Sequence, residues 1–490
     1  MKAFKPAHLL SSGLLFYFLL PYVIFLTYYR FSFDFNLAEL FWVIKNSLLQ
    51  AGLTAMICVV LSLPMSQGLF ALSEKWQSIT LRLLIIPQIL PALFSILIAF
   101  SLFDTFPMGS IGIIILFVFT NLGFATLLAY SAAREKLGAL PVISEIYSLG
   151  RYGFFTQVYL RVLRRDLIAN FLLIFIFCLS SFSIPLIVGG GRGTNIEVLV
   201  YEKIFVEQNW PAAFGLCMVQ ALFIFVISYF MLKNRKSDEK AEFSSGRYLE
   251  SYFGVLLIFI YLLLYFGGYL VGLVKSLSYF GFIAEYWAEL ASVTWFTSKA
   301  LVFYLLLNFL LLWLWLLDYL KNLKFNLAIN MISVSTVLIG FALYLFFPLT
   351  KDFDILKIVF AMSVLYFPGL FKLFLQGPIE NLHRQVLISK MYGLSSSTII
   401  IEIILKQISQ KLFLWLSMLT IWFISEYALF KALGVQTQTL GLFSEGFLSS
   451  YRLPASYIMS FYILVYWVAV MLILYFSLKV VYVAYKKFIA

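Results

Sequence analysis

The sequence predicts an all-α polytopic membrane protein of about twelve transmembrane helices, arranged as two fused six-helix halves that repeat in parallel. Of the 490 residues, 63% are hydrophobic and 12% are charged, whereas about 25% are charged in an ordinary soluble domain. The apolar residues form continuous runs of about 20 residues, the length that crosses a hydrocarbon core as a helix. A polar run near the middle of the chain separates two sets of such runs.

Twelve apolar runs are long enough to be spans, and they are continuous rather than alternating, which favours helices over strands. They are 9–29, 48–72, 83–104, 111–132, 168–189, 211–232, 252–274, 298–319, 325–348, 355–376, 412–433 and 456–480. Bulky residues follow the first run instead of a cleavage site, so we expect an uncleaved first helix. Lys and Arg concentrate on one side if the amino terminus is inside, so we expect both termini in the cytoplasm.

The chain divides into a first transmembrane half at 1–233, a cytoplasmic linker at 234–250 and a second transmembrane half at 251–490. Small and turn-forming residues recur at a separation of 243 positions, which indicates a duplication. The recurring pairs are Gly150 and Gly393, Gly191 and Gly434, Thr194 and Thr437, Pro211 and Pro454, and Ala212 and Ala455.

Composition argues against several kinds of chemistry. Three Cys and two His are too few for a metal cluster or a disulfide framework, so we expect no metal and no catalytic residue. Asp352 and Asp354 form a close acidic pair, but they fall in a short external loop, where we expect both to be solvated. The net charge of +12 reflects basic cytoplasmic loops rather than nucleic-acid binding. No phosphate-binding Gly-Lys-Ser/Thr loop occurs, so we expect no cofactor in this chain.

Two polar cytoplasmic loops are the most informative segments. They cover 140–165 and 383–397, and each predicts a short helix, a glycine break and a second amphipathic helix. An amphipathic helix in this place can dock into the groove of a partner protein. It can equally lie on anionic lipid, held by Arg161, Arg164 and Arg165.

The Leu149-Gly150 break and the segment that follows it resemble the EAA loop in permease subunits of binding-protein-dependent ABC importers. The stretch from Ser180 to Tyr201, with its Gly-Gly-Gly turn, is similar to the fused two-half permeases of thiamine and iron(III) importers. Ser144 and Leu387 stand where that family has Glu, and Glu145 is one place away.

This resemblance implies an inner-membrane permease of a bacterium that binds an ABC ATPase dimer on its cytoplasmic side, one ATPase per loop. ATP would bind to that partner, and a periplasmic or surface solute-binding protein would deliver thiamine, a related small solute or iron(III). The residues that the resemblance assigns to ATPase coupling are Ser144, Glu145, Leu149, Gly150, Phe154, Phe155, Tyr392, Gly393 and Leu394.

Polar residues within two spans are candidates for the translocation path. Glu426 lies in the outer half of the eleventh span, where a charge is costly and usually functional. It can attract a cationic substrate, or it can pair with Lys431 or Arg452. The serines of the fifth span can line the path or pack helices; they are Ser180, Ser181 and Ser183.

Two other classes of protein share some of these features. A twelve-span secondary transporter fits the length and the duplication, but its basic signature between spans two and three is absent. A polytopic enzyme acting on lipid-linked substrates would need paired carboxylates or a metal site at the membrane surface. We therefore expect a transport subunit rather than an enzyme.

Overall fold

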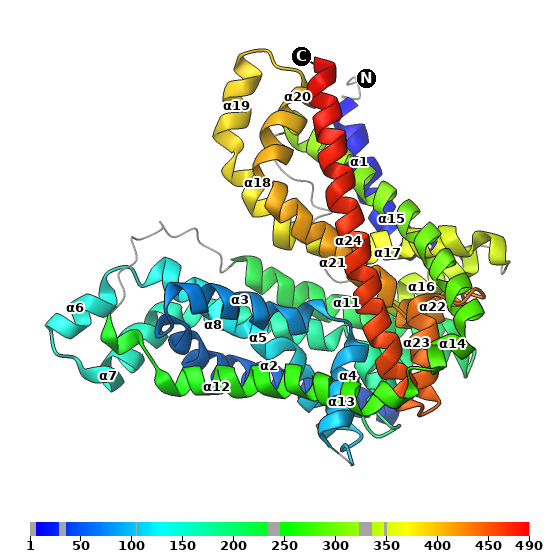
Figure 1. The fold of residues 1–490 in the computed structure, drawn as a ribbon, viewed down its shortest axis with the longest axis horizontal. Helices are drawn as coiled ribbons and strands as arrows, with labels where there is room; N and C mark the ends of the chain where they lie inside the picture. The colour runs from blue at the N-terminus through cyan, green and yellow to red at the C-terminus, as the bar shows by residue number, and fades with distance from the viewer. Residues whose placement is uncertain are drawn as a thin grey trace. The chain divides into compact units, whose positions relative to one another are not determined.

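The computed structural model describes residues 6–28, 36–103, 105–233, 246–322, 336–346 and 350–489. Within these ranges all regular secondary structure is helical and no strand is present, which confirms the all-α class (Figure 1). The predicted linker at 234–250 lies mostly outside the described residues, since only 246–250 are described.

Six helices in the described ranges are long and apolar enough to cross a membrane by length and composition. They are Leu37–Phe70, Ser110–Lys136, Arg247–Tyr279, Trp287–Lys321, Lys351–Asn381 and Leu453–Ser477. A bent pair of helices makes a seventh if it is counted as one span. The helices thus support a polytopic membrane protein, while the total of twelve spans stays a prediction.

The bent pair replaces the straight span predicted at 83–104. Glu74–Ile89 and Ala92–Leu102 meet at an angle of 101°. The cause is Pro91, because a proline disfavours helical backbone at the residue before it, and Leu90 has an extended ψ of 143°.

Contacts group the chain into two compact units, which are not the two consecutive halves of the sequence. Unit 1 is Met1–Phe31 with Ser278–Ala490, and unit 2 is Ser32–Leu277. The first helix of each sequence half therefore packs within the unit built mainly from the other half.

Unit 2 is a bundle around α2, which contacts α5, α8 and α12 along its length (Figure 1). Gly68 of α2 and Gly254 of α12 let the two backbones touch, because a Cβ on Gly254 would overlap the carbonyl of Pro64. The elements are α2 (Leu37–Phe70), α3 (Glu74–Ile89), α4 (Ala92–Leu102), α5 (Ser110–Lys136), α6 (Leu140–Ile146), α7 (Gly150–Gly153), η1 (Phe154–Tyr159), α8 (Leu160–Leu179), α9 (Ser183–Val188), α10 (Ile196–Phe205), α11 (Trp210–Lys233), η2 (Arg247–Leu249), α12 (Tyr252–Leu262), η3 (Leu263–Gly267) and α13 (Gly268–Ser276).

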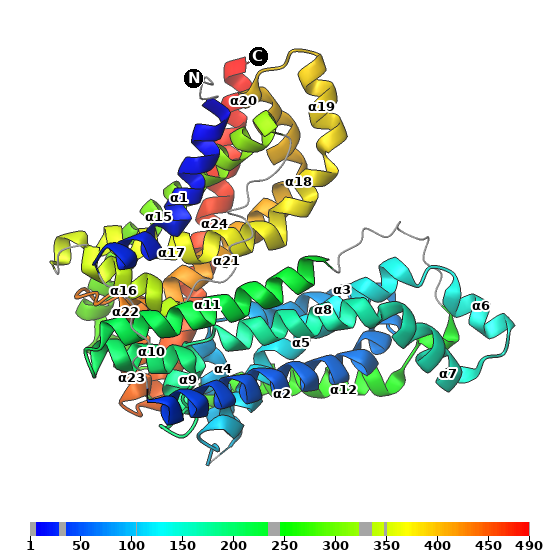
Figure 2. The same ribbon diagram turned by 180° about the vertical axis from the view of Figure 1, so that it is seen from behind.

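Unit 1 has an aromatic core beneath α1, which lies beside α15 (Figure 2). The ring of Trp315 stacks on Phe367 and Phe371 at centroid distances of 5.2 and 5.4 Å, and Phe18 of α1 lies 5.6 Å from it. Each such pair adds about 1 kcal/mol beyond the area it buries. The elements are α1 (Pro6–Tyr28), α14 (Phe282–Glu285), α15 (Trp287–Asn322), α16 (Thr336–Phe346), η6 (Lys351–Phe353), α17 (Asp354–Phe371), η7 (Lys372–Gln376), α18 (Gly377–Asn381), α19 (His383–Met391), α20 (Ser396–Thr398), η8 (Ile399–Leu405), α21 (Ser409–Ser425), α22 (Ala428–Ala432), α23 (Leu440–Ser449) and α24 (Leu453–Ile489).

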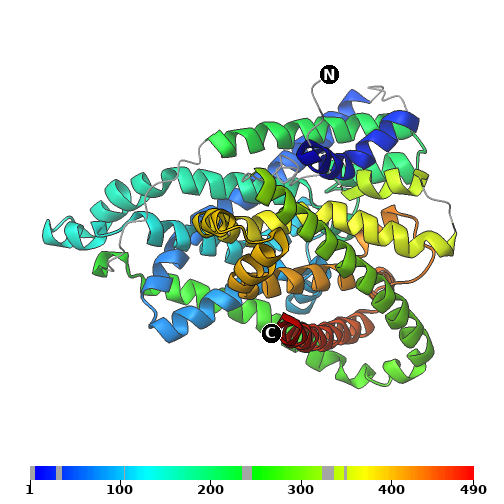
Figure 3. The ribbon, with the colours of Figure 1, turned by 90° about the horizontal axis from the view of Figure 1, so that it is seen from above.

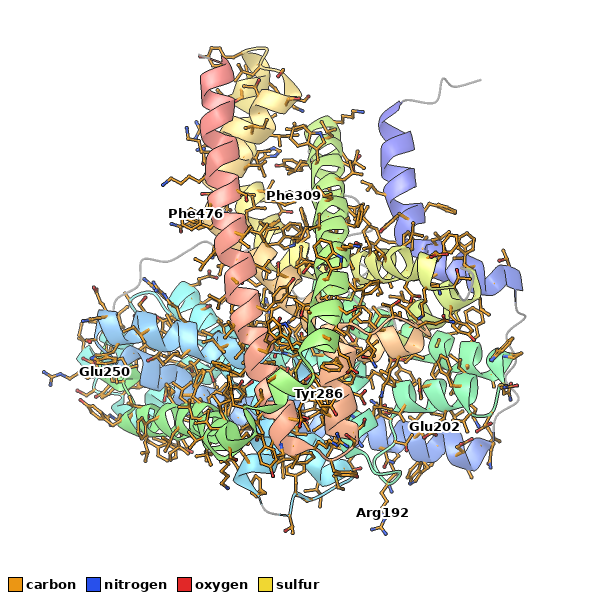
Figure 4. The ribbon with its side chains drawn as sticks, turned by 45° about the vertical axis from the view of Figure 1, so that its right-hand side comes forward. Arg192, Glu202, Glu250, Tyr286, Phe309 and Phe476 are labelled. Atoms are coloured by element: carbon orange, nitrogen blue, oxygen red, sulfur yellow. The ribbon has the colours of Figure 1, made fainter. Side chains whose placement is uncertain are left out.

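The long helix α24 shows the outward apolar face that a lipid-facing helix needs. It runs without a break and is seen nearly end-on, in dark red, in Figure 3. Phe476 is 60% exposed and points away from the ribbon of its unit (Figure 4). Because no water reaches such a face in a bilayer, its exposure suits lipid rather than solvent.

Candidate functional site

The first polar loop, predicted at 140–165, lies at the end of unit 2 with α6 and α7 and contains a tight double turn (Figure 1). The amide of Leu149 donates to the carbonyl of Ser144 at 3.0 Å, and the amide of Ser148 donates to that of Glu145 at 2.9 Å. This bond pattern ends a helix at a residue in the left-handed conformation, and Ser148 has a φ of 51°. Gly150, with a φ of 72°, then starts the next short helix.

The second polar loop, at 383–397, ends its helix in the same way. The amide of Leu394 donates to the carbonyl of Ser389 at 3.2 Å, and the amide of Gly393 donates to that of Lys390 at 3.0 Å. Gly393 has a φ of 73°, which glycine adopts without strain. Ser395 then caps α20 by accepting a bond from the backbone of Thr398.

The two turns match at a separation of 245 positions. Like residues form five pairs at this spacing: Ile143 and Ile388, Ser144 and Ser389, Ile146 and Met391, Tyr147 and Tyr392, and Leu149 and Leu394. Both serines donate a hydroxyl bond to the carbonyl four residues earlier, at 2.7 and 2.8 Å. The turn geometry thus places Ser148, and not Gly150, at the position of Gly393, because the first loop makes this left-handed turn with a serine. Gly150 and Gly393 share a left-handed φ of 72° and 73°, so their pairing at a separation of 243 stays a prediction.

Each loop exposes an apolar and aromatic surface. We define the first loop surface as Ile143, Ile146, Tyr147 and Leu149, and the second loop surface as Ile388, Met391, Tyr392 and Leu394. Tyr147 is 76% exposed and Tyr392 is 82% exposed. Contiguous exposed apolar side chains mark interaction sites in proteins.

Buried side chains anchor both loops to long helices. Phe154 and Tyr159 are fully buried, and the hydroxyls of Tyr159 and Ser66 lie 2.7 Å apart. Phe155 is partly exposed and stacks on Tyr159. In the second loop Ile399 lies 245 positions after Phe154, at the start of the π-helical turn η8, and it is likewise buried. Each surface is therefore fixed to the helix that follows it, α8 or α21.

A charged side chain at matching positions ties each loop to a neighbouring backbone. Oε1 of Glu145 accepts a bond from the amide of Tyr248 at 3.1 Å. Lys390, 245 positions later, donates from its ammonium group to the carbonyl of Leu320. Burial lowers the pKa of Lys390. Glu145, which the resemblance assigns to coupling, thus has one oxygen occupied within the chain.

We predict that Gly393→Ala loosens the second loop. The left-handed turn is strained for alanine and costs about 1 kcal/mol, although open space surrounds the site. Amide hydrogen exchange in α19 should become about fivefold faster. Gly377→Ala is the matched control, since Gly377 also has open space but lies in helical backbone. Equal exchange in the two variants would contradict the prediction.

The candidate path residues lie where two predicted spans break. α8 ends at Leu179 and α21 ends at Ser425, so the runs at 168–189 and 412–433 are interrupted helices. Ser180 donates its hydroxyl to the carbonyl four residues earlier at 2.8 Å, and Ser425 does the same at 2.5 Å. The two serines are again 245 positions apart.

The break in the fifth span is held by α10. The side-chain amide of Asn195 donates to the carbonyl of Ser181 at 2.7 Å, while its Oδ1 caps α10 at the amide of Val198. Ser183 starts α9 and, like Ser181, is partly exposed. Beyond α9, Arg192 points away from the ribbon (Figure 4).

Glu426 occupies the break in the eleventh span. Its Oε2 accepts the hydroxyl of Tyr366 at 2.5 Å, and its Oε1 accepts the amide of Leu429 at 2.9 Å, which caps α22. Lys431, one of the two basic residues expected to pair with Glu426, instead binds Glu445 at 2.6 Å. Glu426 is partly exposed as a residue, but its carboxylate is buried and held by these bonds.

Asp354 is a residue whose importance the sequence did not reveal. Its Oδ2 accepts bonds from the amides of Gln436 and Thr437 and from the Thr437 hydroxyl, at 3.1, 2.9 and 2.9 Å. Lys357 lies 3.6 Å from its Oδ1, and both side chains are fully buried. The expectation of a solvated Asp354 is wrong, whereas Asp352 is exposed. Asp354 thus fixes the turn that follows α22.

Several transport permeases are similar to this chain in sequence. The thiamine transport system permease protein ThiP of Brucella abortus (strain 2308) is 26% identical over 259 residues, which are 47% of this chain and 48% of that protein. ThiP of Escherichia coli (strain K12) is 27% identical over 199 residues, or 37% of each chain.

A Haemophilus influenzae protein named as a ferric transport system permease, FbpB 1, is 27% identical over 219 residues, 39% of this chain and 34% of that protein. The chain is similar to thiamine and ferric transport permeases. This confirms the resemblance expected from the loops and from the segment after the fifth span. The chain covers about half the length of the ThiP relatives from Brucella. No protein-family model and no solved structure matches it significantly.

Proposed function

We propose that this chain is the permease subunit of a binding-protein-dependent ABC importer, with twelve spans in two fused, parallel six-span halves. The similarity to thiamine and ferric transport permeases supports a transport role. Matching turns, loop surfaces and helix breaks at one spacing of 245 positions support a duplicated architecture. In this proposal the chain lies in a bacterial inner membrane with both termini in the cytoplasm.

The observation that carries the proposal is the pair of exposed loop surfaces. Each presents a tyrosine more than 70% exposed, beside an equally exposed Ile146 or Met391. Aromatic and Met side chains are enriched where proteins bind partners. Two equivalent surfaces on one chain fit two copies of an ABC ATPase, one on each loop.

The mechanism follows from how the loops are anchored. The buried Phe154 and Ile399 join each loop surface to α8 or α21, and those helices lead to the breaks at Ser180 and Glu426. Close-packed cores transmit displacement because they cannot compress. Closure of the ATPases on ATP would thus move the broken spans, and interrupted helices are where transporters form substrate sites.

The proposed substrate is thiamine or a related small solute, or iron(III), delivered by a separate solute-binding protein. The proposed path includes Ser180, Ser181, Ser183 and Glu426. A carboxylate in an apolar span favours a cation, and that of Glu426 is oriented by Tyr366 and by the backbone of α22.

Glu426→Gln tests this path. The amide keeps an oxygen acceptor for Leu429 but removes the charge, so we expect uptake of a cationic solute to fall about tenfold, a loss of about 1.4 kcal/mol. Asp352→Asn, which removes an exposed charge, is the control and should leave uptake unchanged. If Glu426→Gln transports normally, the carboxylate serves only to cap α22.

Co-purification tests the proposal as a whole. The chain should bring down a candidate ABC ATPase from the same genome, and solute with its binding protein should stimulate ATP hydrolysis by the complex. A twelve-span secondary transporter would instead move solute without either partner.

A further inference from the structure

A short segment before α12 lies directly against α6. We call Gly246–Glu250 the strap; it includes the single 3-10 turn η2 (Arg247–Leu249) and contacts α6. Leu249 is fully buried, and the ring of Tyr248 lies 6.3 Å from that of Phe154. Figure 1 shows the start of α12 beside α6 and α7, and Figure 4 labels Glu250 at the end of the strap.

Two features specify the contact of the strap with α6. The amide of Tyr248 donates to Oε1 of Glu145 at 3.1 Å. Gly246 is buried, and a Cβ there would lie 2.8 Å from Oε1 of Glu145, 2.9 Å from the carbonyl carbon of Pro141 and 3.0 Å from the Pro141 Cβ. The Glu145 side chain could shift, but the two Pro141 atoms cannot move aside cheaply because the proline ring constrains that backbone. Only glycine fits this approach.

The other end of the strap is fixed to α2 and α12. The amide of Ser251 donates to the carbonyl of Gln67 at 3.4 Å, and the Ser251 hydroxyl caps α12 at the amide of Gly254. Gly254 then packs with no gap against Pro64 and Gly68 of α2. The strap is therefore held at both ends between the first loop and two long helices.

We propose that the strap positions the first loop surface and transmits its displacement to α12 as well as to α8. This inference rests on the proposed permease function. Its consequence is specific: residues at the end of the predicted linker carry motion from α6 of the first sequence half to α12. Glu145 and Gly246 are positioning residues in this scheme and need not touch the ATPase.

Gly246→Ala is the decisive variant, with Gly267→Ala as its control, because a Cβ at Gly267 meets only one side-chain atom at 3.9 Å. In Gly246→Ala we expect the amount of solute taken up per ATP hydrolysed to fall at least about fivefold. The affinity of this variant for the ATPase should stay within about twofold of that of the unmodified chain. Glu145→Leu removes the acceptor for Tyr248 and should give the same loss, whereas Glu145→Gln keeps an acceptor and should restore it. Normal uptake per ATP in both Gly246→Ala and Glu145→Leu would overturn the inference.

A second measurement separates this inference from the proposed function. In the purified full chain without any partner, amide exchange in α6 should be at least about fivefold faster in Gly246→Ala than in Gly267→Ala. Unchanged exchange would overturn the strap whether or not an ATPase binds. Failure of the unmodified chain to bind any ATPase, with the exchange difference present, would overturn the permease proposal and leave the strap as a structural brace.

Discussion

Replacing Tyr147 and Tyr392 together by Asp should abolish binding of the ATPase. Tyr147 and Tyr392 stand at the ends of α6 and α19 and are 76% and 82% exposed, so the chain itself should fold normally. Buried at an interface, a tyrosine often contributes about 2 kcal/mol or more, and a carboxylate in its place would be desolvated without a partner. We expect affinity to fall by at least about 30-fold per site, measured by equilibrium binding of the ATPase to the purified chain.

The control for this prediction is Trp76→Asp. Trp76 is 61% exposed and lies on the predicted cytoplasmic side, but it is outside both loop surfaces. The Trp76→Asp variant should bind the ATPase as tightly as the unmodified chain does. If the double tyrosine variant bound normally, or if Trp76→Asp were equally defective, the loop surfaces would not be the docking sites.

Unit 1 should unfold far more readily in the Asp354→Ala variant than in variants changed at surface residues. It would leave the fully buried Lys357 without its counter-charge and would release the three bonds to Gln436 and Thr437. Breaking one side of a buried pair costs about 3–5 kcal/mol. Thermal unfolding in detergent, followed by the loss of monodisperse protein, should report a clear fall in melting temperature.

Two variants make this test specific. Asp352→Ala removes a neighbouring exposed carboxylate and should leave the melting temperature unchanged. Asp354→Asn with Lys357→Met removes both charges while keeping an acceptor for the Thr437 amide, and it should recover part of the stability. A melting temperature of Asp354→Ala equal to that of Asp352→Ala would contradict the role assigned to the pair.

Much of the fold and the place of the loops could be predicted because hydropathy and turn residues are local signals. Continuous apolar runs predicted the helical class, and the glycine breaks located both polar loops. The register between the loops was not accessible in this way. Ser148 adopts a left-handed turn that its residue type does not signal, so the like residues 245 positions apart stood out only once the hydrogen bonds of the two turns were compared.

Features that depend on contacts between distant residues could not be predicted from the sequence. The burial of Asp354 depends on a turn 82 residues further along the chain. The packing of α1 within unit 1 and of α12 within unit 2 likewise leaves no trace in local hydropathy. The breaks at Ser180 and Glu426 escaped notice because apolar residues continue on both sides, although Ser and Glu within a span were the available signal.

Uptake by the reconstituted chain tests whether it is a gate driven by a separate ATPase. The chain is placed in sealed vesicles with and without the ATPase, with solute-loaded binding protein outside and ATP on the ATPase side. We predict uptake only when the ATPase and ATP are both present. Uptake by the chain alone, driven by an ion gradient and indifferent to ATP, would show that it is a secondary transporter instead.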